Sequence, residues 1–174
     1  MSVRLIILGL LRDQELHGYE LKKILEEEMG DWARVAVGSI YFALDKLAED
    51  GLIEDRGTRQ EGNRPAKTVY RVTKAGKAEF LRLLRETWTT EERQSFDLDA
   101  GLAFMDALPQ DEIAGYLRAR VEELEAKIKG LEQHEASTLA GPEVTESTRW
   151  IFSHHLAHYR AELEWNRGAL AEME

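Results

Sequence analysis

The chain has 174 residues, no cysteine and a formal net charge of −10. This length allows a hydrophobic core in one or two small domains. The lack of cysteine excludes disulfides and thiolate metal sites, and no apolar run approaches the roughly 20 residues that a membrane span requires. The apolar run Leu5–Leu11 is followed directly by charged residues without a small-residue cleavage site, so we predict a cytoplasmic protein rather than a secreted one.

The negative charge is concentrated in the second half of the chain. Residues 1–90 have a net charge of 0, and residues 91–174 have a net charge of −10. Between Arg56 and Arg85, nine lysines and arginines stand against two glutamates, a local charge of +7. Salt screens charges over about 8–10 Å, so a distant acidic region does not cancel such a patch. Because phosphate neutralisation at the contact supplies DNA affinity, this segment is a candidate DNA-binding surface.

Two helices are predicted before the basic segment. Val3–Leu11 is almost entirely apolar, which is typical of a helix buried on most sides. The second helix is predicted to open at Leu16 and run to Met29, with Leu21, Ile24 and Leu25 at the spacing of a buried face. Together they would form the first half of a small helical core.

A third helix is predicted from Ser39 to about Asp50. Ser39 is a favourable N-cap residue, and Ile40, Leu44 and Leu47 recur at the spacing of a buried helical face. Gly51 provides the stop signal. The remaining surface would be shared by Ser39, Tyr41, Phe42, Asp45, Lys46 and Glu49.

A basic two-stranded hairpin is predicted next. Leu52 and Ile53 begin its first strand, and Thr68–Val72 is rich in the β-branched and aromatic residues of a second strand. Asp55–Lys67 would form the turn, and Thr73 would cap a further helix. A helix followed by a basic hairpin is how a winged helix meets DNA, with the helix in the major groove and the hairpin on the backbone or minor groove.

This arrangement gives a set of candidate DNA contacts. Specificity is predicted to come from the start of the third helix, and affinity from the cations of the wing. Lys22 fits a backbone contact and an ordinary solvated face equally well. The candidates are Ser39, Ile40, Tyr41, Phe42 and Lys46 in the third helix, Lys22 in the second, and Arg56, Arg59, Arg64 and Lys67 in the wing.

The composition changes near Thr89, so we predict a DNA-binding domain over residues 1–90 and a helical domain over residues 91–174. Phe96–Leu108 is a short helix candidate, and two long helices begin near Asp111 and Val144 around the breaker Gly141-Pro142. Apolar residues recur in both long helices at alternating steps of three and four, which predicts an antiparallel hairpin that dimerises with a second copy. The predicted dimerisation residues are Leu117, Val121, Leu124, Ile128, Leu131, Phe152, Leu156, Tyr159, Leu163 and Leu170.

Four motifs in order resemble the PadR-type transcriptional regulators. They are Leu16-His17-Gly18-Tyr19-Glu20-Leu21, Gly38-Ser39-Ile40-Tyr41-Phe42-Ala43-Leu44, Leu47-Ala48-Glu49-Asp50-Gly51-Leu52-Ile53 and residues 64–76. The resemblance is specific over about residues 3–88, and the acidic tail is similar to the longer members with a virulence-activator-like helical domain.

The resemblance implies a mainly α fold, with a winged helix-turn-helix followed by a dimerising helical hairpin. It also implies a dimeric regulator of a palindromic operator, usually a repressor released by a small aromatic effector. Matching positions carry over Tyr19, Ser39 and Tyr41 as DNA contacts, with Arg64 and Lys67 in the wing. Phe42 departs from the family pattern, where proline commonly follows the tyrosine.

Two other residue groups suggest ligands. His154 and His158 are four apart and would share a helix face within reach of one zinc ion, but the pattern lacks further ligands and favours a polar stripe in a dimer interface. We therefore predict no metal and no cofactor. Aromatic effectors bind apolar, aromatic-lined sites, so the effector candidates are Trp32, Trp88, Trp150 and Trp165.

Catalytic motifs are missing from the sequence. It has no cysteine nucleophile, no Gly-x-Ser-x-Gly, no P-loop and no dinucleotide fingerprint, so we predict that the protein is not an enzyme. Two alternatives remain: a winged helix used for protein contact through the helical tail, and a regulator of the MarR type, which also dimerises through helices. Salt dependence of duplex binding separates DNA binding from protein contact.

Overall fold

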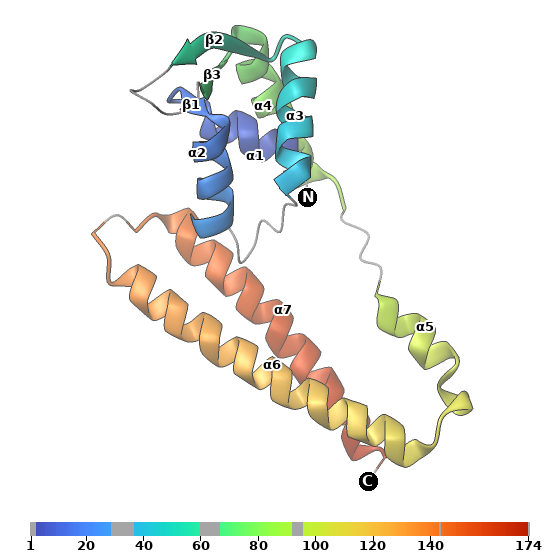
Figure 1. The fold of residues 1–174 in the computed structure, drawn as a ribbon. Coiled ribbons are helices and arrows are strands. Elements are labelled where there is room, and N and C mark those ends of the chain that lie inside the picture. The colour runs from blue at the N-terminus through green and yellow to red at the C-terminus, as the bar shows by residue number, and fades with distance from the viewer. Residues whose placement is uncertain (1–2, 29–36, 60–66, 92–95, 143, 174) are drawn as a thin grey trace. The chain divides into compact units, whose positions relative to one another are not determined.

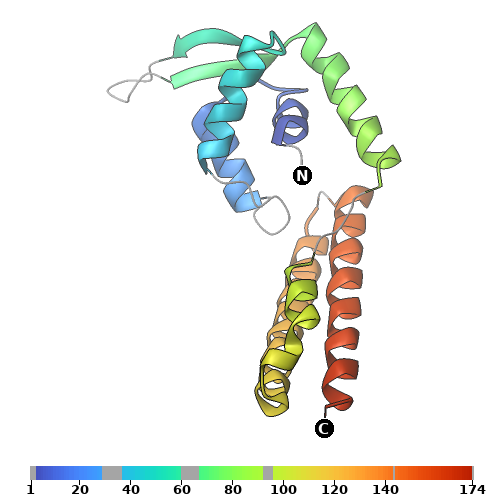
Figure 2. The ribbon, with the colours of Figure 1, turned by 90° about the vertical axis from the view of Figure 1, so that its right-hand side faces the viewer.

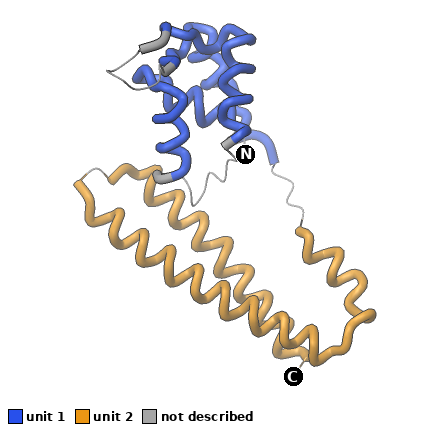
Figure 3. The backbone as a smooth tube through the Cα atoms, viewed as in Figure 1, with its two compact units in different colours: residues 1–93 blue, residues 94–174 orange. Residues whose placement is uncertain are grey.

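The computed structural model describes residues 3–28, 37–59, 67–91, 96–142 and 144–173. The chain forms two compact units, residues 1–93 and residues 94–174 (Figure 3). The predicted fold class is confirmed: the protein is mainly α-helical with one small antiparallel sheet (Figure 1). Within the described ranges, no helix has the length and apolar composition that crossing a membrane requires.

The described residues of the first unit form four α-helices, a π-helical turn and three strands. In chain order they are α1 (Val3–Leu10), β1 (Leu16–His17), α2 (Gly18–Lys23), the π-helical turn Ile24–Glu28, α3 (Val37–Glu49), β2 (Ile53–Arg59), β3 (Lys67–Val72) and α4 (Lys74–Thr89). The apolar positions of α1, α2 and α3 meet in one core, which Phe80 of α4 completes. Ile7, Leu21 and Leu44 are fully buried there. Burying an aliphatic side chain contributes about 1.5–3 kcal/mol, so this core holds the unit together.

The sheet has the strand order β1-β3-β2, and both pairings are antiparallel. Leu16 pairs with Tyr70, and Ile53 pairs with Val72. An irregularity between Asp55 and Thr58 interrupts the β2–β3 ladder. The N–H of Gly57 donates to Oδ1 of Asp55 over 2.6 Å, and Gly57 has a φ of 89°. Such a left-handed residue is typical of a bulge that bends a strand, so the wing is kinked at Gly57.

One threonine joins the end of α3 to the start of α4. The Thr73 hydroxyl donates to the carbonyls of Gly51 (2.8 Å) and Leu52 (3.1 Å), and it accepts the N–H of Gly76 (3.0 Å) as the predicted helix cap. Gly51 has a φ of 68° and ends α3 in the left-handed conformation, as its place in the sequence predicts. The junction therefore fixes α4 directly against the end of α3.

The second unit is built on a hairpin of two long helices. Its elements are α5 (Asp97–Ala103), a 3-10 turn (Met105–Ala107), α6 (Gln110–Leu139) and α7 (Glu146–Ala171). Figures 1 and 2 both show α6 and α7 side by side along their lengths. Leu124, Ile128, Leu156 and Leu163 form the centre of their shared core.

Ion pairs between α6 and α7 define their antiparallel alignment. Arg167 on α7 contacts Glu125 on α6 over 2.6 Å, and Arg160 contacts Glu132 over 2.8 Å. Later residues of α6 thus face earlier residues of α7. These pairs are exposed, and such pairs contribute at most about 1 kcal/mol each, so the apolar seam supplies most of the hairpin's stability.

Three boundaries differ from those predicted. Leu16 and His17 form a strand rather than the first turn of α2, because their backbone pairs with β3. The third helix begins at Val37 instead of Ser39. The wing strands continue to Arg59 and from Lys67, so the predicted turn from Asp55 is too long. In the first and third cases pairing with a distant strand decides the conformation, which local sequence patterns do not report.

Candidate nucleic-acid interface

Helix α3 presents one apolar face to the core and one mixed face to solvent. Phe42 is 72% exposed and Tyr41 is 45% exposed, which is unusual for side chains of their size on a well-packed helix. Ile40 is 0% exposed, so its assignment as a DNA contact is wrong. The helical period that places Tyr41 and Phe42 outside turns Ile40 into the core with Leu44 and Leu47.

Ser39 lies inside the first turn of α3 and is exposed. Its predicted role as the N-cap is wrong, because the helix already includes Val37 and Gly38. An exposed hydroxyl in the first turn remains well placed for a phosphate or a base edge, since the free N–H groups of a helix N-terminus favour anions. Contact with DNA therefore stays a prediction for Ser39.

The start of α2 supports Tyr41. A Cβ atom built on Gly18 would lie 3.1 Å from Cε1 of Tyr41, so the tyrosine ring packs against the glycine backbone. This contact holds the Tyr41 ring at the surface between α2 and α3. Gly18 is a positioning residue that the sequence analysis missed. The position of Gly18 inside the Leu16–Leu21 motif is the sequence feature that could have indicated this role.

His17 fixes the beginning of α2. The Glu20 N–H donates to Nδ1 of His17 (3.1 Å), and the His17 N–H donates to Oε2 of Glu20 (3.0 Å). This reciprocal pair is a capping box. Tyr19 lies between the two residues and is 57% exposed, while Lys22 pairs with Glu26 over 3.7 Å. Tyr19 is thus accessible, and Lys22 has a carboxylate neighbour on its own helix.

Two further cations of the candidate set have acidic neighbours. Nζ of Lys46 contacts Oε2 of Glu49 over 2.9 Å, and this hydrogen bond raises the pKa of Lys46 above its ordinary value. Arg56 approaches Glu54 (3.6 Å) and Glu15 (3.9 Å). All of these side chains are exposed, and exposed pairs contribute at most about 1 kcal/mol, so exchanging a carboxylate for a DNA phosphate costs little.

The described part of the wing extends the exposed face of unit 1. Arg56 lies beside the bulge at Gly57, where the strand changes direction. Arg59 and Lys67 are strand residues whose side chains lie outside the described set, and Arg64 falls in the segment 60–66, which is also outside it. DNA contact by these three residues stays a prediction.

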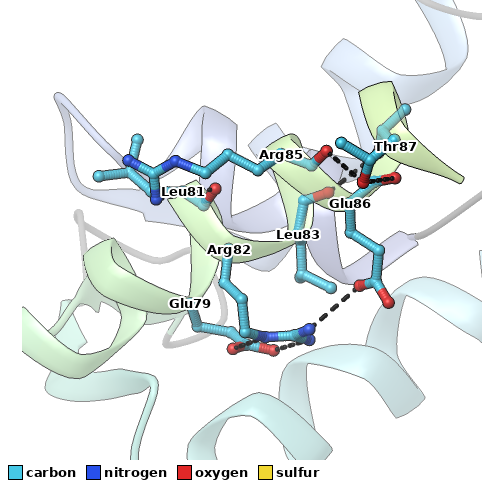
Figure 4. A network of polar contacts seen from close by, with 8 residues as sticks. Glu79, Leu81, Arg82, Leu83, Arg85, Glu86 and Thr87 are labelled. Carbon is cyan, nitrogen blue, oxygen red and sulfur yellow. Dashed lines mark hydrogen bonds and ion pairs between the residues drawn. The ribbon is translucent and has the colours of Figure 1, made fainter.

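The basic segment is less uniformly positive than its sequence indicates. Arg82 forms hydrogen-bonded ion pairs with Glu79 (2.8 Å) and Glu86 (3.1 Å) along α4 (Figure 4). The hydrogen bond with Arg82 lowers the pKa of Glu79. Arg85 directs Nη1 to the carbonyl of Leu81 over 3.5 Å. Arg82 therefore has two carboxylate partners on its own helix, whereas Lys46 has one.

The ten predicted dimerisation residues lie along the α6–α7 seam. Six of them are buried within the single chain: Leu117, Leu124, Ile128, Phe152, Leu156 and Leu163. These six are therefore core residues of the hairpin and are not available to a second copy without rearrangement. Val121, Leu131, Tyr159 and Leu170 remain partly exposed. Dimerisation through this unit stays a prediction.

Trp150 and Trp165 lie too far apart on α7 to line one small pocket. Trp88 belongs to α4, whereas Trp150 and Trp165 are separated by 15 residues of α7, about 22 Å along the helix. Trp165 lines a groove of about 500 Å³ between α5 and the hairpin, together with Phe96, Leu102 and Arg120. Trp32 lies outside the described residues. Only Trp165 of this set thus lines a described groove large enough for a small aromatic molecule.

Comparison with known proteins agrees with this architecture. Residues 7–82 match the model of a protein family described as "Transcriptional regulator PadR-like family". The negative transcriptional regulator PadR of Bacillus subtilis is 28% identical over 155 residues, which cover 89% of this chain and 85% of that protein.

Solved structures match over both units. The crystal structure of Bacillus subtilis PadR in complex with operator DNA has a TM-score of 0.83 at 24% identity, covering 99% of each chain. The same protein with p-coumaric acid has a TM-score of 0.78 at 22% identity, covering 98% of this chain and 94% of that one. The Vibrio cholerae virulence activator AphA has a TM-score of 0.76 at 21% identity, covering 99% and 98%. With the winged-helix core, the capping box of α2 and the helical hairpin in place, residues 7–82 form a PadR-like domain, and the chain is similar to PadR over both units.

Proposed function

We propose that this protein is a dimeric, sequence-specific DNA-binding repressor that acts in the cytoplasm and is released by a small aromatic effector. The observation that carries the proposal is the exposure of Tyr41 and Phe42 on α3, beside the wing that contains Arg56. Helix α3 enters the major groove, Tyr41 and Ser39 contact phosphates or base edges, and the wing contacts the backbone. The operator complex of Bacillus subtilis PadR supports this arrangement.

Dimerisation is assigned to residues 94–174. The α6–α7 hairpin buries one seam but leaves Tyr116 and Trp150 more than half exposed. A second copy of the hairpin covers such residues, and a two-fold dimer then presents two α3 helices to a palindromic operator with half-sites about one helical turn apart. Effector binding acts by favouring a dimer geometry in which the two α3 helices no longer match the half-sites.

The effector is assigned to the groove beside Trp165. Its apolar lining residues, Phe96, Leu98, Leu102 and Trp165, suit a flat ring, and the remaining lining residues are the charged Asp97, Asp99, Arg120 and Glu162. The p-coumaric acid complex of Bacillus subtilis PadR supports a phenolic compound as the first candidate. Such a compound should release the protein from DNA, and the Trp165→Ala variant should no longer respond to it. Together these two results would connect the groove with regulation.

The test is binding to the DNA upstream of the protein's own gene, measured by fluorescence anisotropy at two salt concentrations. The proposal requires two protomers per duplex, a preference over random duplex, and affinity that falls with salt at a log–log slope of about −0.9 per phosphate neutralised. Tyr41→Phe should weaken binding while leaving the fold intact. Lack of any salt-dependent duplex binding, on this or other upstream regions, would contradict the proposal.

Protein contact is the second candidate function. Phe42 favours it, because a large exposed aromatic side chain is also a common anchor of protein interfaces. In that case Phe42→Ala would abolish partner capture, and the protein would show no preference among duplexes. The PadR-like match of residues 7–82 favours a PadR-type regulator over the MarR-type alternative.

A further inference from the structure

Two histidines on α7 lie unusually close together. Nε2 of His154 and Nε2 of His158 are 3.2 Å apart, and their ring centroids are 4.6 Å apart. Both side chains are exposed, and each presents its ring nitrogen to the same point of the helix surface. The four-residue spacing in the sequence indicates only that the two histidines share a helix face, whereas the structure shows that their Nε2 atoms are close together.

The separation matches a pair of metal ligands. Two nitrogens bound to one tetrahedral zinc ion at about 2.0–2.1 Å lie about 3.3–3.4 Å from each other. The observed 3.2 Å between the two nitrogens is within about 0.2 Å of this separation. We propose that His154 and His158 form a bidentate site for a divalent transition-metal ion, independent of the DNA-binding surface.

The ligand type decides which ions fit. Neutral imidazole nitrogen suits Zn²⁺, Ni²⁺ and Cu²⁺, while Mg²⁺ and Ca²⁺ prefer oxygen. Among the described residues, no group of three or more histidine or acidic side chains is arranged around one metal position. Water molecules complete the coordination, so the metal keeps open positions at the protein surface.

Neighbouring residues provide the matched control. His155 is next to the pair, but its ring centroid is 5.9 Å from that of His154, compared with 4.6 Å between His154 and His158. Consecutive helical residues face different directions, so His155 does not share the metal position. His155→Gln therefore removes one imidazole from the same helix and leaves the pair complete.

The experiment is isothermal titration of the full-length protein with ZnCl₂ in a non-coordinating buffer. One zinc ion per chain should bind, and His154→Ala or His158→Ala should each weaken binding by at least about tenfold, as expected when a ligand is lost. His155→Gln should bind like the wild type. Zinc should also raise the Tm of the wild type and of His155→Gln, but not that of the other two variants, because a ligand that binds only the folded state stabilises it.

Three outcomes would overturn the assignment. Equal binding by the wild type and the double variant His154→Ala/His158→Ala would place the zinc elsewhere, for example on the acidic face of the hairpin. Equal loss in His155→Gln would contradict the pair as the ligand set. Competition by an equal concentration of MgCl₂ would indicate attraction by the net negative charge rather than coordination by imidazole.

Discussion

Nε of Arg120 on α6 donates a hydrogen bond to Oδ1 of Asn166 on α7 over 3.2 Å. Asn166 is 0% exposed and stands in the apolar seam of the hairpin. Its Nδ2 donates to the carbonyl of Glu162 (2.8 Å), and Nη2 of Arg120 donates to Oε1 of Glu162 (2.9 Å). A buried amide must be satisfied in this way, so the network allows only one alignment of the two helices.

Asn166→Ala should lower the free energy of unfolding by about 1–3 kcal/mol, because a buried hydrogen-bonding group is removed and its partners lose their bonds. Urea denaturation followed by circular dichroism measures this change. Glu132→Gln is the matched control, since it weakens an exposed link to Arg160 between the same helices and should cost less than about 1 kcal/mol. An equal loss of unfolding free energy in the two variants would contradict the assignment of Asn166 as the residue that sets the alignment.

Gly76→Ala should destabilise the protein although alanine normally favours helix by about 1 kcal/mol over glycine. A Cβ atom at this position would lie 2.0 Å from the carbonyl oxygen of Leu52 and 2.7 Å from Cγ2 of Val72. The backbone must therefore shift at the α3–α4 junction. Gly130 on α6 has nothing within 4 Å of its Cβ position, so Gly130→Ala should stabilise instead. Thermal denaturation should give opposite signs, and the same sign for both would contradict the steric explanation.

Ile40→Ala and Phe42→Ala should act on different properties. Ile40 is in the core, so its truncation should cost about 2–5 kcal/mol of stability. Phe42 is exposed, so Phe42→Ala should leave the Tm nearly unchanged and weaken operator binding. Anisotropy and thermal denaturation on both variants separate the two effects. A stable Ile40→Ala protein with altered operator preference would restore Ile40 as a base contact.

Arg64→Ala should weaken binding to every duplex sequence and make the salt slope shallower by about 0.9, since one phosphate contact is lost. Arg56→Ala at the wing bulge should do the same. Arg82→Ala is the control, because Glu79 and Glu86 already neutralise this arginine. The salt dependence of anisotropy measures the slope. Selective loss on the operator alone would show that Arg64 reads bases instead.

The Glu79–Arg82 pair should make the free energy of unfolding depend on pH in the acidic range. The hydrogen bond from Arg82 lowers the pKa of Glu79 below the ordinary value of 4.5. The folded state therefore gains stability above pH 4.5 and loses it as the pH falls through the lowered pKa. Glu79→Gln should lack this contribution, because its side chain does not ionise. Melting curves from pH 3 to pH 7 should converge for the two proteins at low pH, and a difference that grows on acidification would contradict the assignment.

The helical periods of the sequence predicted most of the fold. Ile40, Leu44 and Leu47 are buried as their spacing indicated, and Gly51 ends α3. The pairing of Leu16 with Tyr70 was not predictable in the same way, because it joins segments more than fifty residues apart. The packing of the Tyr41 ring against the backbone of Gly18 was not predictable for the same reason, because these residues are far apart in the sequence. Local patterns report burial well, but they do not report which distant backbone supplies a partner.

Thr73 gives the amino-terminal unit a mechanical property. Its hydroxyl holds the carbonyls after α3, its N–H donates to Leu52 O over 3.0 Å, and it caps α4. Helix α4 is 16 residues long, about 24 Å, and is clamped at its first turn. Helix α4 is therefore attached to the end of α3 at one end. We expect motion imposed at its far end, near Thr89, to reach the end of α3 through these hydrogen bonds instead of being absorbed in a loop.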